Sequence, residues 1–235
     1  MAQQVTRVLA FTASAHRPLY LRHCILQMQS QTYPCTHSVF LNASEYQGPD
    51  DSTNYCLLMT DIAIAKGFNL HIAYGKQGHQ HFNHVTAIEQ VDINAYDLFL
   101  KIDDDDIYRS QYIEHVVQSF EQDNWDFSGA ATKGVVQGSR IQKKSEACFK
   151  KDPKNLHDHP LDQAMPGTYA FSQKAMRLII KKGAQYTWKK HYEDPTWLTW
   201  MLEDPQIRAM YRNQDDYTYV IHETNFSRRE KTSKN

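Results

Sequence analysis

The sequence predicts an α/β protein with a single domain, in which a mostly parallel central sheet is flanked by helices. Short apolar runs typical of buried strands alternate along the chain with longer amphipathic stretches of helical period. Strands that alternate with helices favour a parallel sheet with crossover helices. A chain of 235 residues suits one large domain of this class, and its 41% hydrophobic and 23% charged residues are ordinary for a globular protein.

The first half of the chain shows this alternation most clearly. Residues 5–12 are mostly apolar and predict the first strand. A helix follows, because an apolar stripe with i, i+3, i+4, i+7 spacing begins at Leu21. Pro18 suits the first turn of this helix, and the helix should end before Pro34 because the residue before a proline avoids the helical region. The other elements expected here are strands at 37–41, 69–73 and 96–102, and helices at 55–66 and 84–91.

The pattern changes after residue 120. Residues 133–162 hold seven Lys or Arg residues and few apolar ones, which predicts a long, mobile and partly ordered segment of the kind that often serves as an active-site lid. In this segment Arg140, Lys143 and Lys144 are candidates to neutralise a diphosphate. The remaining expected elements are strands at 125–131, 166–171 and 217–221, a helix at 173–182 capped by Gly183, and a helix at 196–202.

Four consecutive aspartates, Asp103 to Asp106, follow the apolar run at 96–102. Adjacent carboxylates repel one another and lose hydration on burial, so packing does not explain them. Ligands gather beyond the carboxyl ends of strands in open α/β sheets, and Mg²⁺ and Mn²⁺ prefer carboxylate oxygens. We therefore predict a divalent-metal site, with a solvated acidic turn as the alternative. Alternate side chains of an extended segment share a side, so Asp103 and Asp105 are expected to face one way and Asp104 and Asp106 the other. One of these pairs could reach the metal while the other caps local backbone N–H groups.

A second pair of carboxylates, Glu193 and Asp194, precedes an expected helix start. Aspartate followed by proline is an ordinary N-cap pattern. The functional alternative is a general base that takes a proton from an acceptor hydroxyl, with its pKa tuned by a surrounding aromatic pocket. The aromatic candidates for that pocket are Trp188, Tyr192 and Trp197.

His222 follows the last expected strand, with Asn225 and Ser227 shortly after it. An imidazole there could complete a metal shell or contact a diphosphate, whereas a lone histidine is more often structural. The chain contains no P-loop, GxGxxG, GxSxG or HExxH pattern, which argues against common ATPases, Rossmann dehydrogenases, α/β-hydrolases and zincins.

The net charge and the cysteine content limit which partners and which cellular compartment we expect. The net charge of −1 gives no reason to expect nucleic acid as a partner. The four cysteines are scattered and form no CxxC pair, which fits reduced thiols, and we see no signal peptide, so we expect a cytoplasmic protein. We also see no run of about 18 apolar residues and therefore expect no transmembrane segment. Residues 228–235 are polar and basic and are expected to form a flexible tail, with at most weak contact to an anionic membrane surface.

Taken in order, several segments resemble the family-2-like nucleotide-diphospho-sugar glycosyltransferases with the GT-A fold. Residues 8–12, 16–21 and 29–34, the last containing SQTYP, are similar to the opening strand and helix of that family. The stretch LKIDDDDIY at 100–108 is similar to its DxD motif. The later matches are 167–171 to the acceptor-side strand, Glu193-Asp194 to the ED motif, and 222–227 to a late H-x-x-N-x-S, so the resemblance covers most of residues 5–227.

This resemblance implies a GT-A-like (Rossmann-like) domain that transfers a sugar from a nucleotide-diphosphate donor to an acceptor hydroxyl. Residues 5–120 would bind the donor, and residues 121–227 would bind the acceptor and carry out catalysis. Mn²⁺ or Mg²⁺ would bridge the diphosphate, and the transfer would be a direct, inverting displacement. The implied catalytic residues are Asp194 and Glu193; the implied metal ligands are Asp103, Asp105 and His222; and the implied substrate-binding residues are Thr12, Ser14, Arg17, Asn42, Asp103, Asp104, Gly167 and Thr168.

Asn42 departs from the family pattern, which usually has an aspartate that reads the base. An amide can still pair with a uracil-like edge because it both donates and accepts, so a UDP-sugar is the favoured donor, with a glycan or another hydroxyl as acceptor. A sugar nucleotidyltransferase is one alternative, although Ser14-Ala15-His16 is not the glycine-rich basic loop it normally needs. The others are a retaining transferase and a non-catalytic carbohydrate- or nucleotide-binding relative, for which a base would have no use.

Overall fold

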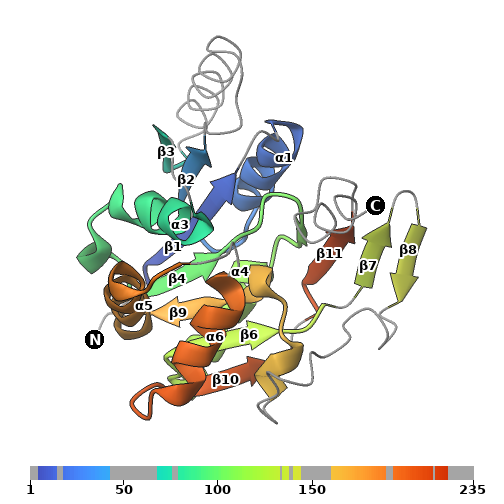
Figure 1. The fold of residues 1–235 in the computed structure, drawn as a ribbon. Coiled ribbons are helices and arrows are strands. Elements are labelled where there is room, and N and C mark those ends of the chain that lie inside the picture. The colour runs from blue at the N-terminus through green and yellow to red at the C-terminus, as the bar shows by residue number, and fades with distance from the viewer. Residues whose placement is uncertain are drawn as a thin grey trace, which may run out of the picture.

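A seven-stranded, mostly parallel sheet forms the centre of the molecule (Figure 1). The computed structural model describes residues 5–14, 18–42, 68–75, 79–132, 134–137, 140–143, 160–188, 193–213 and 215–221. In spatial order the strands are β10 (Ala209–Arg212), β6 (Phe127–Ala130), β9 (Ala170–Ser172), β4 (Leu98–Lys101), β1 (Val8–Ser14), β2 (Thr36–Asn42) and β3 (Leu70–Gly75). β9 runs antiparallel to both of its neighbours and the other pairs are parallel, which confirms the predicted fold class.

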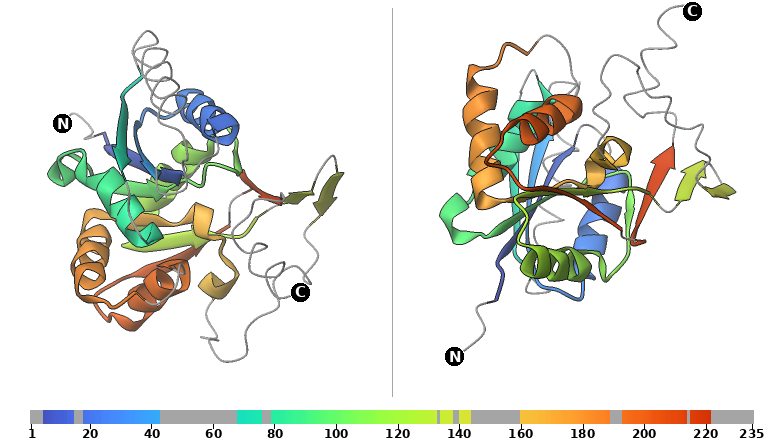
Figure 2. Two further views of the ribbon diagram at one scale, coloured as in Figure 1. Left: turned by 45° about the horizontal axis from the view of Figure 1, so that its top comes forward. Right: turned by 90° about the horizontal axis from the view of Figure 1, so that it is seen from below.

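Helices cover both faces of this sheet (Figure 2). α1 (Pro18–Gln29) and α4 (Tyr112–Asp123) supply apolar side chains to the core on one face; α3 (Gln80–Glu89), α5 (Gln173–Gln185) and α6 (Glu193–Glu203) supply them on the other. The side chains of β1 alternate between the two cores: Val8 and Ala10 belong to the first, and Leu9 and Phe11 to the second. β1 is therefore buried on both faces, as its continuous apolar run predicts.

A smaller, four-stranded sheet stands beside the first, on the right in Figure 1. Its order is β5 (Ile107–Tyr108), β11 (Tyr217–Ile221), β7 (Gly134–Gln137) and β8 (Arg140–Lys143). Three short 3₁₀ helices complete the described elements: η2 (Ile93–Ala95), η4 (Pro160–Gln163) and η5 (Pro166–Thr168). Because β5 directly follows the aspartates, the small sheet is joined to the large one through the aspartate turn.

The charged segment at 133–162, predicted to be a mobile and partly ordered lid, contains regular structure at both of its ends. Residues 134–137 and 140–143 form an antiparallel hairpin, and 160–163 form η4. The missed signal is the apolar pair Val135-Val136 followed by Gly138-Ser139 and Ile141, an apolar pattern too short to stand out from the surrounding charges. Residues 144–159 lie outside the described residues, as do the expected helix at 55–66 and the tail at 228–235.

Two further boundaries differ from expectation. Residues 166–168 form η5, so the strand predicted at 166–171 is confined to Ala170–Ser172. α5 continues through Gly183, which was expected to cap it. A Cβ at Gly183 would lie 2.0 Å from His81 Nε2, so the glycine lets the His81 ring of α3 pack directly against α5. Here glycine marks a close contact between helices rather than a helix end.

Among the described residues, no helix has both the length and the apolar character needed to cross a membrane. Cys24 and Cys35 are free thiols, and burial raises the pKa of Cys35 to about 12. Cys56 and Cys148 lie outside the described part of the chain.

Candidate functional site

The four aspartates form a turn between β4 and β5, not the extended segment that we expected. Asp104 and Asp106 are each 1% exposed, whereas Asp103 and Asp105 remain partly exposed. The four aspartates therefore form a partly exposed pair, Asp103 and Asp105, and a buried pair, Asp104 and Asp106. The pairing is the one that we expected, although it is produced by a turn and not by the alternation of an extended strand.

The buried pair fixes the turn to both sheets. Ser14 Oγ donates a hydrogen bond to Asp104 Oδ2 at 2.5 Å, which ties the turn to the end of β1. Asp106 accepts hydrogen bonds from the Tyr217 hydroxyl and, at 3.0 Å, from the Val220 N–H, both in β11. Burial raises the pKa of the Asp106 carboxyl well above its ordinary value, and the neighbouring aspartates add to this rise.

A buried lysine that the sequence analysis missed lies at the centre of the site. Lys101, the last residue of β4, is 1% exposed. Its Nζ lies 2.7 Å from Asp103 Oδ1 and 3.3 Å from Asp194 Oδ1. One ammonium is thus shared by two carboxylates that come from distant parts of the chain. The available signal was a charged residue closing an otherwise apolar strand directly before the aspartates.

Asp194 reaches this lysine from the start of α6. The helix begins at Glu193, so Asp194 lies inside the first turn rather than at the predicted N-cap position. Its side chain is 25% exposed, and burial raises the pKa of its carboxyl while the charge of Lys101 opposes the rise. Two members of the predicted aromatic pocket, Trp188 and Trp197, both contact His81.

Gly167 brings the expected acceptor-side segment directly onto the aspartate turn. A Cβ at this position would lie 2.9 Å from Tyr108 Oη and 3.0 Å from both Asp103 Oδ2 and Asp106 Oδ2. The Tyr108 hydroxyl accepts from the Asp103 N–H at 2.9 Å and donates to the Gly167 carbonyl at 3.0 Å. The contact between η5 and the turn is therefore so close that only glycine fits without displacing a neighbour.

Two predicted substrate-binding hydroxyls are engaged by the protein itself. Thr12 is fully buried, and its Oγ1 lies 2.9 Å from Nε2 of His37, a histidine whose pKa burial lowers to about 3. Thr168 is also fully buried; its Oγ1 lies 2.6 Å from the Met165 carbonyl oxygen and accepts from the Ala130 N–H at 2.8 Å. In this structure both threonines hold strands and turns in position.

The other predicted site residues are described only in part. Asn42 ends β2 and is partly exposed. Arg17, Lys144 and His222 lie outside the described residues. Glu193 is the first residue of α6, and Arg140 and Lys143 are the two ends of β8. For these three residues the structure describes the backbone only.

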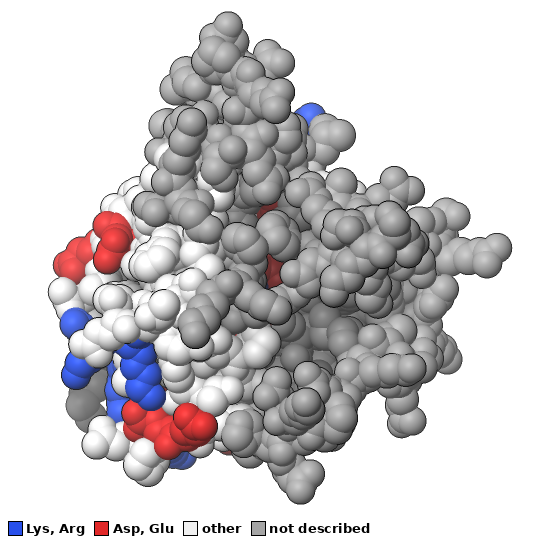
Figure 3. Space-filling view, in the orientation of Figure 1, with Lys and Arg blue, Asp and Glu red and all other residues white. Residues whose placement is uncertain are grey.

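Asp103 and Asp105 are the residues that could hold a divalent cation. Figure 3 shows acidic atoms at the bottom of a hollow near the middle of the face drawn in Figure 1. Within the described ranges there is no cluster of three or more His, Cys, Asp or Glu side chains that could hold a metal. Mg²⁺ is usually bound by one or two carboxylates while waters and substrate phosphates fill its shell, so two partly exposed aspartates fit a cation that binds together with a nucleotide.

Comparison with solved structures finds other proteins with this fold. No protein-family model matches the sequence, and no curated protein matches it either. S. aureus TarS 1–349 in complex with UDP aligns with a TM-score of 0.65 and 14% identity over 92% of this chain and 61% of that one. The mannosyltransferase PcManGT from Pyrobaculum calidifontis, in complex with GDP-Man and Mn²⁺, aligns with a TM-score of 0.64 and 12% identity over 94% of this chain and 58% of that one.

A further match is a different kind of enzyme, and this chain aligns with nearly all of its length. The 4-diphosphocytidyl-2C-methyl-D-erythritol synthase from Anaerococcus prevotii aligns with a TM-score of 0.56 and 11% identity over 94% of this chain and 92% of that one. By contrast, the chain spans only about three fifths of the length of the two transferases. At these identities the likeness establishes the fold, and the expected GT-A-like domain is confirmed.

Proposed function

We propose that this protein is a metal-dependent glycosyltransferase that moves a sugar from a nucleotide-diphosphate donor to an acceptor hydroxyl. The observation that carries the proposal is the convergence of Asp103 and Asp194 on Lys101 at the carboxyl ends of the strands. Ligands bind at this edge in open α/β sheets, and the solved structures of the same fold include complexes with UDP and with GDP-Man and Mn²⁺.

Three carboxylates take two different roles in this proposal. Asp103 and Asp105 hold Mn²⁺ or Mg²⁺ on the donor side; when bound, the cation offsets negative charge on the departing nucleoside diphosphate. Asp194 accepts the proton of the acceptor hydroxyl as that oxygen attacks the anomeric carbon, giving an inverted product. A pKa raised by burial suits a carboxylate for this task, and the first turn of a helix favours its anionic form.

The remaining assignments are part of the same proposal. Residues 5–120 bind the donor, with Asn42, Arg17 and the Ser14–Asp104 pair on the nucleotide side. Residues 121–227 carry the acceptor side, where Gly167 packs against the aspartates and His222 completes the metal shell. A UDP-sugar is the preferred donor and a glycan or another hydroxyl compound the acceptor, and the free thiols of Cys24 and Cys35 fit the cytoplasm as the compartment.

Ligand-induced stabilisation tests this proposal most directly. A ligand that binds the native state raises the unfolding temperature, so Mn²⁺ with UDP- or GDP-sugars should do so and chelation should abolish the effect. Asp105→Ala should remove the Mn²⁺-dependent part of the shift, while Asp123→Ala, an exposed aspartate at the end of α4, should keep it. Nucleotide-sugar binding by Asp105→Ala that keeps its full Mn²⁺ dependence would contradict the metal assignment.

A nucleotidyltransferase is the second candidate, favoured by the synthase whose whole length this chain nearly covers. The two candidates differ in the substrate they consume. A nucleotidyltransferase releases pyrophosphate from a nucleoside triphosphate, whereas a glycosyltransferase releases a nucleoside diphosphate from a nucleotide sugar. Assaying both products with purified protein separates them.

A further inference from the structure

We propose that Lys101 is a positioning residue that connects the donor side of the site to the acceptor side. The proposal rests on the proposed function, which assigns Asp103 to the donor metal and Asp194 to the acceptor. The Lys101 ammonium lies 2.7 Å from an oxygen of Asp103 and 3.3 Å from an oxygen of Asp194. It is therefore in contact with both carboxylates at once.

The surroundings of Lys101 keep this ammonium in place. The side chain is 1% exposed, and lysine is almost never fully buried unless it is paired. On one side β4 is paired with β1, in a register that sets Phe11 opposite Lys101. On the other side the Lys101 N–H donates to the Tyr169 carbonyl at 2.9 Å. The backbone is thus held from both sides, and the amine has little freedom to seek water.

The charges of this cluster suggest how the connection works. A single positive charge is divided between two negative ones, so neither carboxylate has the ammonium to itself. If Asp103 held a divalent cation, Lys101 would have to share that carboxylate with it, and the ammonium would then interact mainly with Asp194. Loading the donor side would thereby fix the orientation of the Asp194 carboxylate towards the acceptor.

Arg212 is the matched comparison within the same molecule. It is also a long cation, 1% exposed, but its Nη2 donates to the Thr168 carbonyl and its guanidinium lies over the Tyr112 ring. Nothing in these contacts joins the two carboxylates assigned to catalysis and metal binding. Removing Arg212 should therefore lower stability without separating metal binding from transfer.

The experiment compares Lys101→Met with Arg212→Met in two independent measurements. The first is Mn²⁺ affinity in the presence of UDP or of GDP, measured by electron paramagnetic resonance without turnover. The second is kcat for sugar transfer at saturating donor. Lys101→Met should bind Mn²⁺ about threefold or more tightly, because a competing cation has gone, yet lose roughly 100-fold in kcat. Arg212→Met should change the two quantities little or in parallel.

The opposite pattern overturns the proposal. Weaker Mn²⁺ binding together with a proportional fall in transfer would mean that Lys101 only supports the structure, and unchanged transfer would mean that it does not position Asp194. If Lys101→Met does not fold, Lys101→Arg replaces it: a reduced kcat with unchanged or tighter Mn²⁺ binding supports the role, and parallel losses refute it.

A double substitution checks that Lys101 acts through Asp194. Asp194→Asn combined with Lys101→Met should lose no more transfer than Asp194→Asn alone, whereas additive losses refute the coupling. Failure of the unaltered protein to bind Mn²⁺ with either nucleotide is a different result, because it would overturn the proposed function itself.

Discussion

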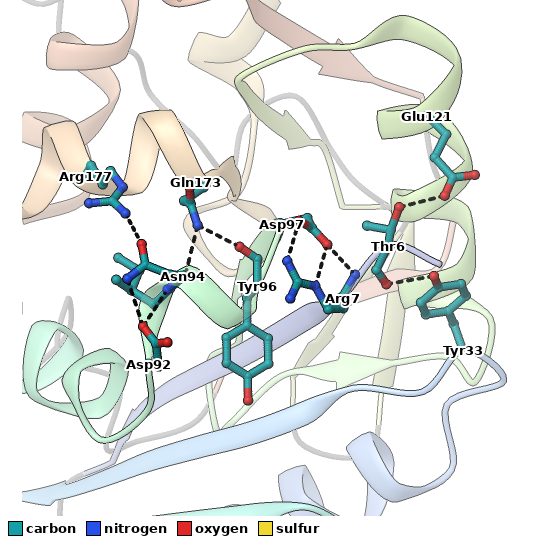
Figure 4. Close-up of polar contacts among 11 residues, drawn as sticks. Thr6, Arg7, Tyr33, Asp92, Asn94, Tyr96, Asp97, Glu121, Gln173 and Arg177 are labelled. Atoms are coloured by element: carbon teal, nitrogen blue, oxygen red, sulfur yellow. Dashed lines mark hydrogen bonds and ion pairs between the residues drawn. The ribbon is translucent and has the colours of Figure 1, made fainter. Parts of the chain in front are cut away.

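The two edges of the central sheet use charge in opposite ways. At the amino edge, Arg7 and Asp97 form a one-to-one pair: Arg7 Nη2 donates to Asp97 Oδ1 at 3.0 Å and Arg7 Nε donates to Oδ2 at 3.1 Å (Figure 4). Both side chains are well exposed, at 51% and 32%. At the carboxyl edge, the ammonium of Lys101 is buried and meets two carboxylates.

Polar groups near the amino edge also find partners within the protein. Figure 4 shows Thr6 donating to Glu121, Tyr33 donating to the Thr6 carbonyl, and Gln173 donating to the Tyr96 carbonyl. At the carboxyl edge, by contrast, Asp103 and Asp194 meet on one buried ammonium, and the neighbouring Asp104 and Asp106 are each 1% exposed. Among the described residues, carboxylates are therefore gathered at this edge.

This difference separates a structural ion pair from a functional cluster. Exposed pairs contribute little to stability because water screens them. Buried carboxylates that share too few cations lower stability, and such groups are concentrated where binding or catalysis needs them. The sharing of one buried ammonium by two carboxylates, more than the presence of charge, is therefore the property on which the proposed site at the carboxyl edge rests.

The largest expected effect of a single change lies at this active edge. Asp194→Asn keeps the shape of the side chain but removes its ability to take a proton, so transfer should fall by roughly 10² to 10⁴-fold. Binding of Mn²⁺ with a nucleoside diphosphate should persist, because the metal ligands are untouched. Steady-state transfer and nucleotide binding, measured on the same preparation, check this; a variant that transfers at the original rate would remove Asp194 as the base.

A smaller effect is expected where η5 contacts the aspartate turn. Gly167→Ala places a Cβ 3.0 Å from carboxylate oxygens of Asp103 and Asp106, so the turn must shift. We expect Mn²⁺ affinity to fall by about tenfold, together with the roughly 1–3 kcal/mol loss in stability that overpacking causes. Mn²⁺ titration and urea unfolding measure the two effects.

Gly129→Ala is the matched control for this substitution. Gly129 lies in β6, and a Cβ there would be 2.7 Å from Ala164 Cβ and 3.3 Å from side-chain atoms of Leu161 and Tyr169. The position is equally crowded, and none of these nearest atoms belongs to a carboxylate. It should lose stability and keep its Mn²⁺ affinity. Equal losses of metal affinity in both variants would show that Gly167 has no special connection to the aspartates.

The features that the sequence predicted are those that depend on local patterns. Some strands are recognisable as local apolar runs, and β11 (Tyr217–Ile221) was found with its predicted limits. The aspartates and Asp194 are also visible locally, as charges next to expected strand and helix ends. α4 (Tyr112–Asp123) was missed although its buried Tyr112, Ile113, Val116 and Val117 have helical spacing.

The features that the sequence did not predict depend on tertiary packing. That Lys101 bridges Asp103 and Asp194 depends on how α6 docks against β4, and no local pattern carries that information. The position of β9 between β4 and β6, antiparallel to both, likewise follows from packing rather than from local periodicity. β10 (Ala209–Arg212) is short and only partly buried, so its apolar signal is weak.

The smallest expected effect belongs to the amino edge. The hydrogen bond from Arg7 lowers the pKa of Asp97, so the stability that the pair provides is present above the unfolded-state value of about 4 and is lost as the pH falls through the lowered value. Arg7→Gln should therefore lower the unfolding temperature only slightly at pH 7, with a smaller difference from the unaltered protein at pH 3 and no change in transfer or Mn²⁺ affinity. Thermal unfolding at both pH values and a transfer assay provide the check. A substantial loss of transfer in Arg7→Gln would contradict the division between a structural edge and a functional one, because an exposed pair at the opposite end of the strands has no route to the site except through the fold.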